Sequence, residues 1–176
     1  MNLTVRPVTV RVCARPVPDR PAGYAYVDEE KNDMIKRAIS AGFLIFLVWG
    51  AIDYLLHGLL LKPTIEASAH LWRAQSEMNL SLIYLVVVIL IVCFVSIYSL
   101  LIANKSLSTG IMYGALSGLA TGVGVGFGTY IHMPVPLALA WGWCLGGWLK
   151  GAVAGAIVGA IVKPSRGTSN LIRRCS

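Results

Sequence analysis

The sequence is poor in charged residues for a protein of its size. Only 13% of its 176 residues are charged, whereas 56% are hydrophobic. A soluble domain typically carries roughly 25% charged residues. The shortage of charge excludes an intrinsically disordered chain and argues against a cytosolic enzyme. The length allows about four membrane spans of ~20 residues each, so the composition predicts a multi-span membrane protein.

The sequence also lacks the common catalytic and cofactor motifs. It contains no Walker A motif, no G-x-S-x-G, no dinucleotide fingerprint outside an apolar run, no H-E-x-x-H and no C-x-x-C-H. Its four cysteines form no C-x-x-C pair, because two lie near the chain ends and two lie inside apolar runs. We therefore predict that the chain is not an enzyme and binds no cofactor.

Basic residues outnumber acidic ones by 15 to 8 and lie mostly outside the apolar region. Eleven of the 15 flank that region: Arg6, Arg11, Arg15, Arg20, Lys31, Lys36, Arg37, Lys163, Arg166, Arg173 and Arg174. Attraction to an anionic cytoplasmic leaflet explains this distribution. No patch of interleaved aromatic and basic residues accompanies the charge, so we expect the lipid bilayer, and no nucleic acid, as a partner.

Four apolar segments predict an all-α fold with four transmembrane helices, over residues 38–61, 80–103, 109–131 and 137–162. Lys and Arg are concentrated in both tails, and the short second loop holds Lys105. The positive-inside rule then predicts that both termini are cytoplasmic in a multi-pass membrane protein.

The two tails are predicted to lie outside the four-helix domain of residues 34–163. Residues 1–33 are rich in proline and arginine, which predicts a disordered basic tail, and residues 164–176 form a basic cytoplasmic tail. Met34-Ile-Lys-Arg is typical of the start of an inner-membrane protein. We therefore hypothesise that residues 1–33 are an upstream extension.

The first outer loop contains a helical pattern of polar residues. Glu66, His70, Arg73 and Glu77 recur every three or four residues, and Ile65, Ala69 and Trp72 form another face. With Thr64 as N-cap, the pattern predicts a short amphipathic helix over 65–78. We expect this helix to lie at the membrane interface, anchored by Trp72.

Glycine is concentrated in the last two predicted spans, where 13 of the 18 glycines fall. Two rows repeat every four residues: Gly110, Gly114, Gly118, Gly122 and Gly126 in the third span, and Gly147, Gly151, Gly155 and Gly159 in the fourth. Such a glycine zipper allows close backbone approach between helices. We favour packing of these two spans against each other, and a homo-oligomeric interface or a glycine-lined pore stays an alternative.

Asp53, His57 and Lys150 are the ionisable residues inside the predicted spans. Charge at bilayer depth costs about 2.5–3.5 kcal/mol, so it usually faces a partner or a cavity. At ~1.5 Å per residue, Asp53 and Lys150 differ in depth by roughly 6 Å. We predict an Asp53–Lys150 ion pair, with His57 one helical turn beyond Asp53 and bonded to it. These residues either set helix register or form a proton relay or substrate site.

The histidines all fall on the predicted outer side of the membrane. Imidazole and carboxylate groups suit zinc or iron, and His57, His70, His132 and Glu66 are weak candidates for metal ligands. A haem would need two facing histidines, such as His57 and His132. Because no metal-binding motif accompanies them, we favour unrelated histidines and no metal site.

Several segments resemble a group of small bacterial four-helix inner-membrane proteins that have no established activity. They are Met34-Ile-Lys-Arg, the run from Asp53-Tyr-Leu-Leu-His57 to Pro63, Leu71-Trp-Arg73 and the Met133-Pro-Val-Pro turn. The resemblance covers about residues 34–163. It implies a four-helix topology in the bacterial cytoplasmic (inner) membrane and transfers no mechanism.

Three functions are compatible with these patterns. We rank a structural or accessory component of a membrane complex first, either as a homo-oligomer or with another membrane protein. A small transporter or proton/ion conduit that uses Asp53, His57 and Lys150 comes second. A metal- or haem-binding membrane redox protein comes third.

Overall fold

The computed structural model describes residues 22–162, which form helices and no strand. The elements are α1 (Ala22–Leu55), the π-helical turn η1 (Leu56–Leu60), α2 (Lys62–Ala67), the 3-10 turns η2 (Ala69–Leu71) and η3 (Gln75–Glu77), α3 (Leu80–Leu101), α4 (Leu107–His132) and α5 (Leu137–Ile161). The predicted tails over 1–21 and 163–176 lie outside the described residues.

Four of these helices are long and apolar enough to cross a membrane, as predicted. They comprise Lys31–Leu60, Leu80–Leu101, Leu107–His132 and Leu137–Ile161. The last three differ from the predicted spans by no more than two residues at either end. Asn79 caps α3 and Ser106 caps α4, since each side chain accepts a bond from the backbone N–H three residues later. The described part of the chain fits a multi-pass membrane protein.

The first helix begins earlier than the sequence predicts. α1 starts at Ala22, so residues 22–33 continue the membrane helix and do not belong to a disordered tail. Pro21 is the last proline before α1, and a proline is tolerated directly before or at the first turn of a helix. After it the chain contains no helix breaker until Pro63 other than single glycines. The prediction treated residues 1–33 as one proline- and arginine-rich tail, but all four of its prolines precede Ala22, and a charged helix can extend beyond a membrane span.

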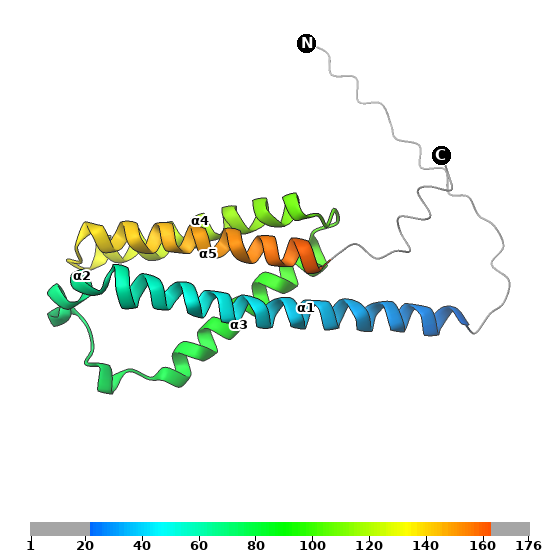
Figure 1. The fold of residues 1–176 in the computed structure, drawn as a ribbon, viewed down its shortest axis with the longest axis horizontal. Helices are drawn as coiled ribbons and strands as arrows, with labels where there is room; N and C mark the ends of the chain where they lie inside the picture. The colour runs from blue at the N-terminus through cyan, green and yellow to red at the C-terminus, as the bar shows by residue number, and fades with distance from the viewer. Residues whose placement is uncertain (1–21, 163–176) are drawn as a thin grey trace, which may run out of the picture.

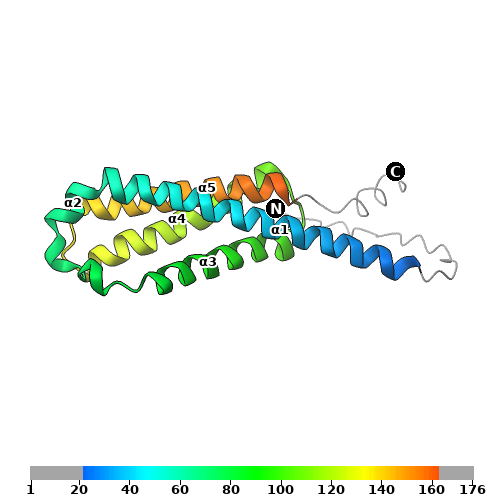
Figure 2. The same ribbon diagram turned by 60° about the horizontal axis from the view of Figure 1, so that its bottom comes forward.

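α4 and α5 lie side by side along their length, and α1 packs against α5 (Figures 1 and 2). α3 crosses α1 obliquely, and its Leu80 end diverges from the other helices (Figure 1). The main core lies where α1, α3 and α5 meet and contains Ala41, Ile45, Ile91, Phe94, Val95, Tyr98, Ala154, Val158 and Val162. Two tyrosines secure α3 to the next segments, because Tyr98 Oη donates to Ser106 O and Tyr113 Oη donates to Phe94 O, both at 3.0 Å.

The predicted amphipathic helix over 65–78 is wrong. α2 begins at Lys62, before the proposed Thr64 cap, and ends at Ala67. Ser68 Oγ donates to Thr64 O at 2.9 Å, and Trp72 Nε1 donates to Ser68 Oγ at 3.2 Å. Trp72 itself is extended, at φ −108° and ψ 154°, which breaks the helical face that the pattern predicted.

Trp72 is held by packing within the chain. Its ring meets the Trp143 ring edge-on, with centroids 5.8 Å apart. Both rings pack against a second buried cluster of Leu61, Val135 and Leu139 at the end of the bundle that carries α2. Burial of the indole against this cluster outweighs the local helical preference of the loop. The predicted membrane anchor is therefore half-buried within the chain.

Candidate functional site

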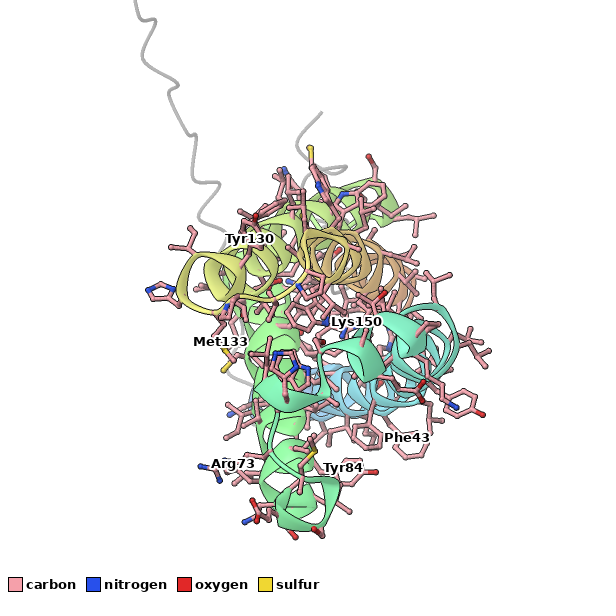
Figure 3. The ribbon with its side chains drawn as sticks, turned by 90° about the vertical axis from the view of Figure 1, so that its left-hand side faces the viewer. Phe43, Arg73, Tyr84, Tyr130, Met133 and Lys150 are labelled. Carbon is pink, nitrogen blue, oxygen red and sulfur yellow. The ribbon has the colours of Figure 1, made fainter. Side chains whose placement is uncertain are left out.

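The candidate site is a polar contact between α1 and α5. Lys150 Nζ donates to Asp53 Oδ1 at 2.7 Å. The Lys150 side chain is 23% exposed and the Asp53 side chain 37% exposed, so neither charge is fully removed from the surface. Seen along the bundle from the α2 end, Lys150 lies among the helices, whereas Arg73 and Tyr84 lie at the periphery (Figure 3). The structure thus brings together the two charges that the depth estimate paired.

Trp49 contributes a second bond to the same contact. Its Nε1 donates to the backbone oxygen of Lys150 at 3.0 Å, and the Lys150 Nζ atom lies 5.8 Å from the Trp49 ring centroid. This distance is within range for a cation–π interaction. Trp49, Asp53 and His57 are spaced by four residues, so they share one face of α1 and of the turn η1 that continues it. That face is directed at Lys150 and Trp143 of α5.

His57 lies in the π-helical turn that ends the first span. The turn is closed by a bond of 2.8 Å from the backbone N–H of Leu61 to Leu56 O, five residues earlier. His57 Nδ1 lies 3.2 Å from the backbone oxygen of Asp53 and 3.7 Å from its Oδ1 atom. The imidazole therefore bonds mainly to the backbone of Asp53. Such π turns recur at functional sites in helices.

The partners of the imidazole define its tautomer. Trp143 Nε1 lies 3.1 Å from His57 Nε2, and an indole N–H can only donate. The backbone oxygen beside Nδ1 can only accept. These two partners fit a neutral His57 ring that carries its proton on Nδ1 and a lone pair on Nε2.

The charged pair has unused hydrogen-bonding capacity. Among the described residues, Asp53 Oδ2 has no hydrogen-bond donor and Lys150 Nζ has a single acceptor. A carboxylate accepts several bonds and an ammonium group donates three. Chemically, the site can take up a water molecule, a small polar group or a proton at Asp53.

The two glycine rows lie at the α4–α5 contact. Gly110, Gly114, Gly118, Gly122 and Gly126 of α4 are buried. A Cβ atom at Gly118 would lie 2.6 Å from Gly147 O and 2.8 Å from Gly151 Cα, both backbone atoms. Cβ atoms at Gly151 and Gly155 would overlap Gly114 and Gly110 in the same way. The contact that we favoured, between the third and fourth spans of one chain, is present, whereas a pore or an interface between copies would need these faces uncovered.

The π turn that follows α1 packs against a further pair of glycines, which belong to α5. A Cβ atom at Gly142 would lie 2.7 Å from Leu61 Cδ2, and one at Gly146 would overlap the Leu56 side chain. In a regular α-helix, residues five apart point about 140° away from each other. The π turn brings Leu56 and Leu61 onto one face, over α5. Gly124 and Gly128 differ from all of these, because added Cβ atoms would meet nothing within 4 Å.

The histidines that we considered as metal ligands are not brought together. His57 Nε2 accepts from Trp143, His132 Nδ1 bonds to Gly128 O at 2.8 Å, and His70 is exposed in η2. Within residues 22–162, no three His, Cys, Asp or Glu side chains are grouped so that they could hold a metal ion. Glu66 is exposed and lies near Lys62, with Oε1 3.9 Å from its Nζ.

Sequence reasoning missed the two tryptophans of the site. Trp49 and Trp143 are two of five tryptophans, and residue type alone does not distinguish them from the others. The four-residue spacing of Trp49 from Asp53 was an available signal for α1. Trp143 lies seven residues before Lys150, a spacing that puts both on one face of α5.

Comparison with known proteins adds no functional assignment. The chain matches no protein-family model, no curated protein and no solved structure. The resemblance to small bacterial four-helix inner-membrane proteins therefore stays a prediction, and the function has to be argued from the geometry alone.

Proposed function

We propose that the chain is a structural or accessory component of a membrane assembly in a bacterial inner membrane, with both termini cytoplasmic. The observation that carries the proposal is the uneven covering of the helices. α4 and α5 cover each other through glycine backbones, whereas most α3 side chains between Leu80 and Leu90 are exposed. Asp53 and His57 are also more than a third exposed at the α1–α5 contact. A partner in the membrane would cover polar groups that lipid covers poorly.

The test is purification of the native protein in a mild detergent. We expect a second membrane protein, or a further copy of the chain, to be retained at a fixed ratio. Replacing Leu85 and Ile89 of α3 by alanine should release it, because these exposed side chains lie on the diverging half of α3. The matched control replaces Leu116 and Leu119, which are exposed on α4. A monodisperse monomer without a partner, from several mild detergents, would contradict the proposal.

The second candidate function is proton or ion conduction. It is favoured by the unused hydrogen-bonding capacity of Asp53 and Lys150, beside a neutral imidazole in a π turn. Carboxylates and histidines inside membrane helices often belong to ion pathways or proton relays. In liposomes that contain the purified protein, Asp53→Asn should abolish proton flux, whereas the exposed Asp33→Asn should not. Absence of flux from the unaltered protein removes this candidate.

A further inference from the structure

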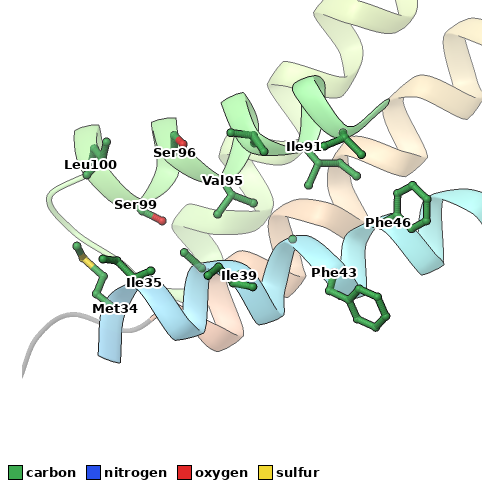
Figure 4. A pocket seen from close by; sticks show the side chains of 14 residues that line it. Met34, Ile35, Ile39, Phe43, Phe46, Ile91, Val95, Ser96, Ser99 and Leu100 are labelled. Atoms are coloured by element: carbon green, nitrogen blue, oxygen red, sulfur yellow. The ribbon is translucent and has the colours of Figure 1, made fainter. Parts of the chain in front are cut away.

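An apolar groove runs between α1 and α3, at the end of the bundle opposite α2 (Figure 4). Its volume is about 600 Å³, and its lining is almost entirely hydrocarbon. α1 contributes the side of the groove from Met34 to Phe46, and α3 contributes the side from Val88 to Leu100. The groove is separate from the Asp53–Lys150 contact, none of whose residues lines it.

The groove matches one leaflet of a bilayer in length. Met34 and Phe46 are twelve residues apart, which is about 18 Å along α1. Half of a bilayer hydrocarbon core is about 15 Å thick. A fatty acyl chain lying along the groove would therefore run from the membrane surface towards the midplane.

One polar atom lies in the wall of the groove and has no partner. Ser99 is 7% exposed, and its hydroxyl has no hydrogen bond within the described residues. Figure 4 shows Ser99 on the stretch of α3 that faces α1. Ser99 is two residues from the end of α3. A helix of 22 residues spans about the thickness of the hydrocarbon core, so its last turn is expected close to the membrane surface. The ester carbonyls of a glycerophospholipid lie at this depth and can accept a bond from the Ser99 hydroxyl.

Basic side chains lie on α1 near the end of the groove that Met34 lines. Lys31 precedes Ile35 by one helical turn and so continues the face that lines the groove. Lys36 lies on the flank of that face and is exposed, with Nζ 3.9 Å from Asp33 Oδ1. An exposed ion pair of this length holds Lys36 weakly. The acidic residues 28–30 lie beyond Lys31, further along α1 from the groove.

We propose that the α1–α3 groove is a binding site for an anionic phospholipid of the cytoplasmic leaflet. One acyl chain lies in the groove, the Ser99 hydroxyl donates to an ester carbonyl, and Lys31 and Lys36 bind the phosphate. Basic pockets between membrane helices on the cytoplasmic side bind such headgroups. A second copy of the chain is a poorer occupant. Copies related by an axis along the membrane normal would bring their lysines to the same end, where like charges repel.

The test is lipid retention by the full-length protein, measured by native mass spectrometry after exchange into detergent with added lipid. Phosphatidylglycerol should bind more tightly than phosphatidylcholine with the same acyl chains. Each lysine near an anionic surface changes the binding constant by about fivefold. Lys31→Gln with Lys36→Gln should therefore reduce the preference by roughly 25-fold at most, while phosphatidylcholine binding stays unchanged.

Variants within the groove separate lipid binding from folding. Gly42→Leu should expel both lipids, because its side chain would enter the groove beside Ile91. Gly50→Leu is the matched control on the same helix, since a Cβ atom there meets nothing within 4 Å. Ser99→Ala should weaken lipid retention without unfolding the protein, because no protein bond is lost.

Three results would overturn the proposal. The first is equal retention of the two lipids by the unaltered protein. The second is full lipid retention by both Gly42→Leu and Ser99→Ala. The third is a dimer that retains no lipid. It would be detected by a cross-link between a cysteine at Ile39 of one copy and a cysteine at Val92 of another.

Discussion

At the scale of single residues, the site depends on one imidazole held between a donor and an acceptor. Trp143 Nε1 and the Asp53 backbone oxygen leave a single neutral tautomer for His57. A neutral ring beside the Asp53–Lys150 pair adds no third charge to the contact. Loss of the indole donor would release Nε2, and the ring could then exchange its proton between the two nitrogens.

We predict that nitrogen NMR of the histidine-labelled protein shows His57 protonated on Nδ1. In Trp143→Phe, which keeps an aromatic ring but removes the donor, the Nε2-protonated form should become populated. His132 serves as an internal control, because its bond to Gly128 O does not involve Trp143. A His57 signal that is unchanged in Trp143→Phe would contradict the proposed tautomer.

At the scale of elements, the α4–α5 pair depends on the absence of side chains. Backbone atoms of one helix occupy the space in which side chains of the other would lie, so an added methyl group has nowhere to move. Close backbone approach supplies much of the attraction between helices in lipid. Gly124 and Gly128 of α4 are under no such constraint, because an added Cβ atom would meet nothing within 4 Å.

We predict that Gly118→Ala lowers the stability of the protein by about 1–3 kcal/mol, as overpacking does in a tight core. Gly124→Ala on the same helix should be neutral, or stabilising by roughly 0.5–1 kcal/mol, because alanine favours helix and the site is open. Reversible unfolding in mixed micelles measures both. If Gly118→Ala and Gly124→Ala have equal effects, the close contact is not present.

The bounds of α3, α4 and α5 followed from the sequence, whereas the start of α1 and its rotation against α5 did not. Hydrophobic runs and capping residues located α3, α4 and α5 closely, because both signals are local. The start of α1 and the broken segment after Ala67 were mispredicted, since proline-rich composition and local spacing were given more weight than helix continuation and Trp72 packing. The Asp53–Lys150 contact could be estimated from depth. The π turn and the Trp143 bond depend on how α1 is rotated against α5, which no local pattern encodes.

At the scale of the whole molecule, the proposed orientation of the chain in the membrane can be tested in cells. Both tails and the loop with Lys105 are proposed to be cytoplasmic, and the loop after α2 and the Met133–Pro136 turn to face outward. The exposed residues Ser76, Asn104 and Pro134 lie in these three connections. They can carry single cysteines once the four native cysteines are replaced.

We predict that an impermeant thiol reagent labels Ser76→Cys and Pro134→Cys in intact cells. Asn104→Cys should be labelled only after the membrane is opened, because its loop carries the basic residue of the inner side. Labelling of Asn104→Cys alone in intact cells would show the opposite orientation.

The Asp53–Lys150 contact joins α1 to α5 and is the centre of the candidate site. A charge swap tests it directly: Asp53→Lys, Lys150→Asp and the double variant are compared by thermal unfolding in the same detergent. Breaking a buried pair costs about 3–5 kcal/mol, and partial exposure reduces this to roughly 2–3 kcal/mol. The same swap at Lys62 and Glu66, which are exposed and 3.9 Å apart, is the control.

We predict that each single change lowers the unfolding midpoint by about 5–10 °C and that the double swap restores most of the loss. The Lys62 and Glu66 variants should change it by no more than about 1–2 °C. A double swap that is as unstable as the sum of the two single variants would contradict the proposed contact between α1 and α5.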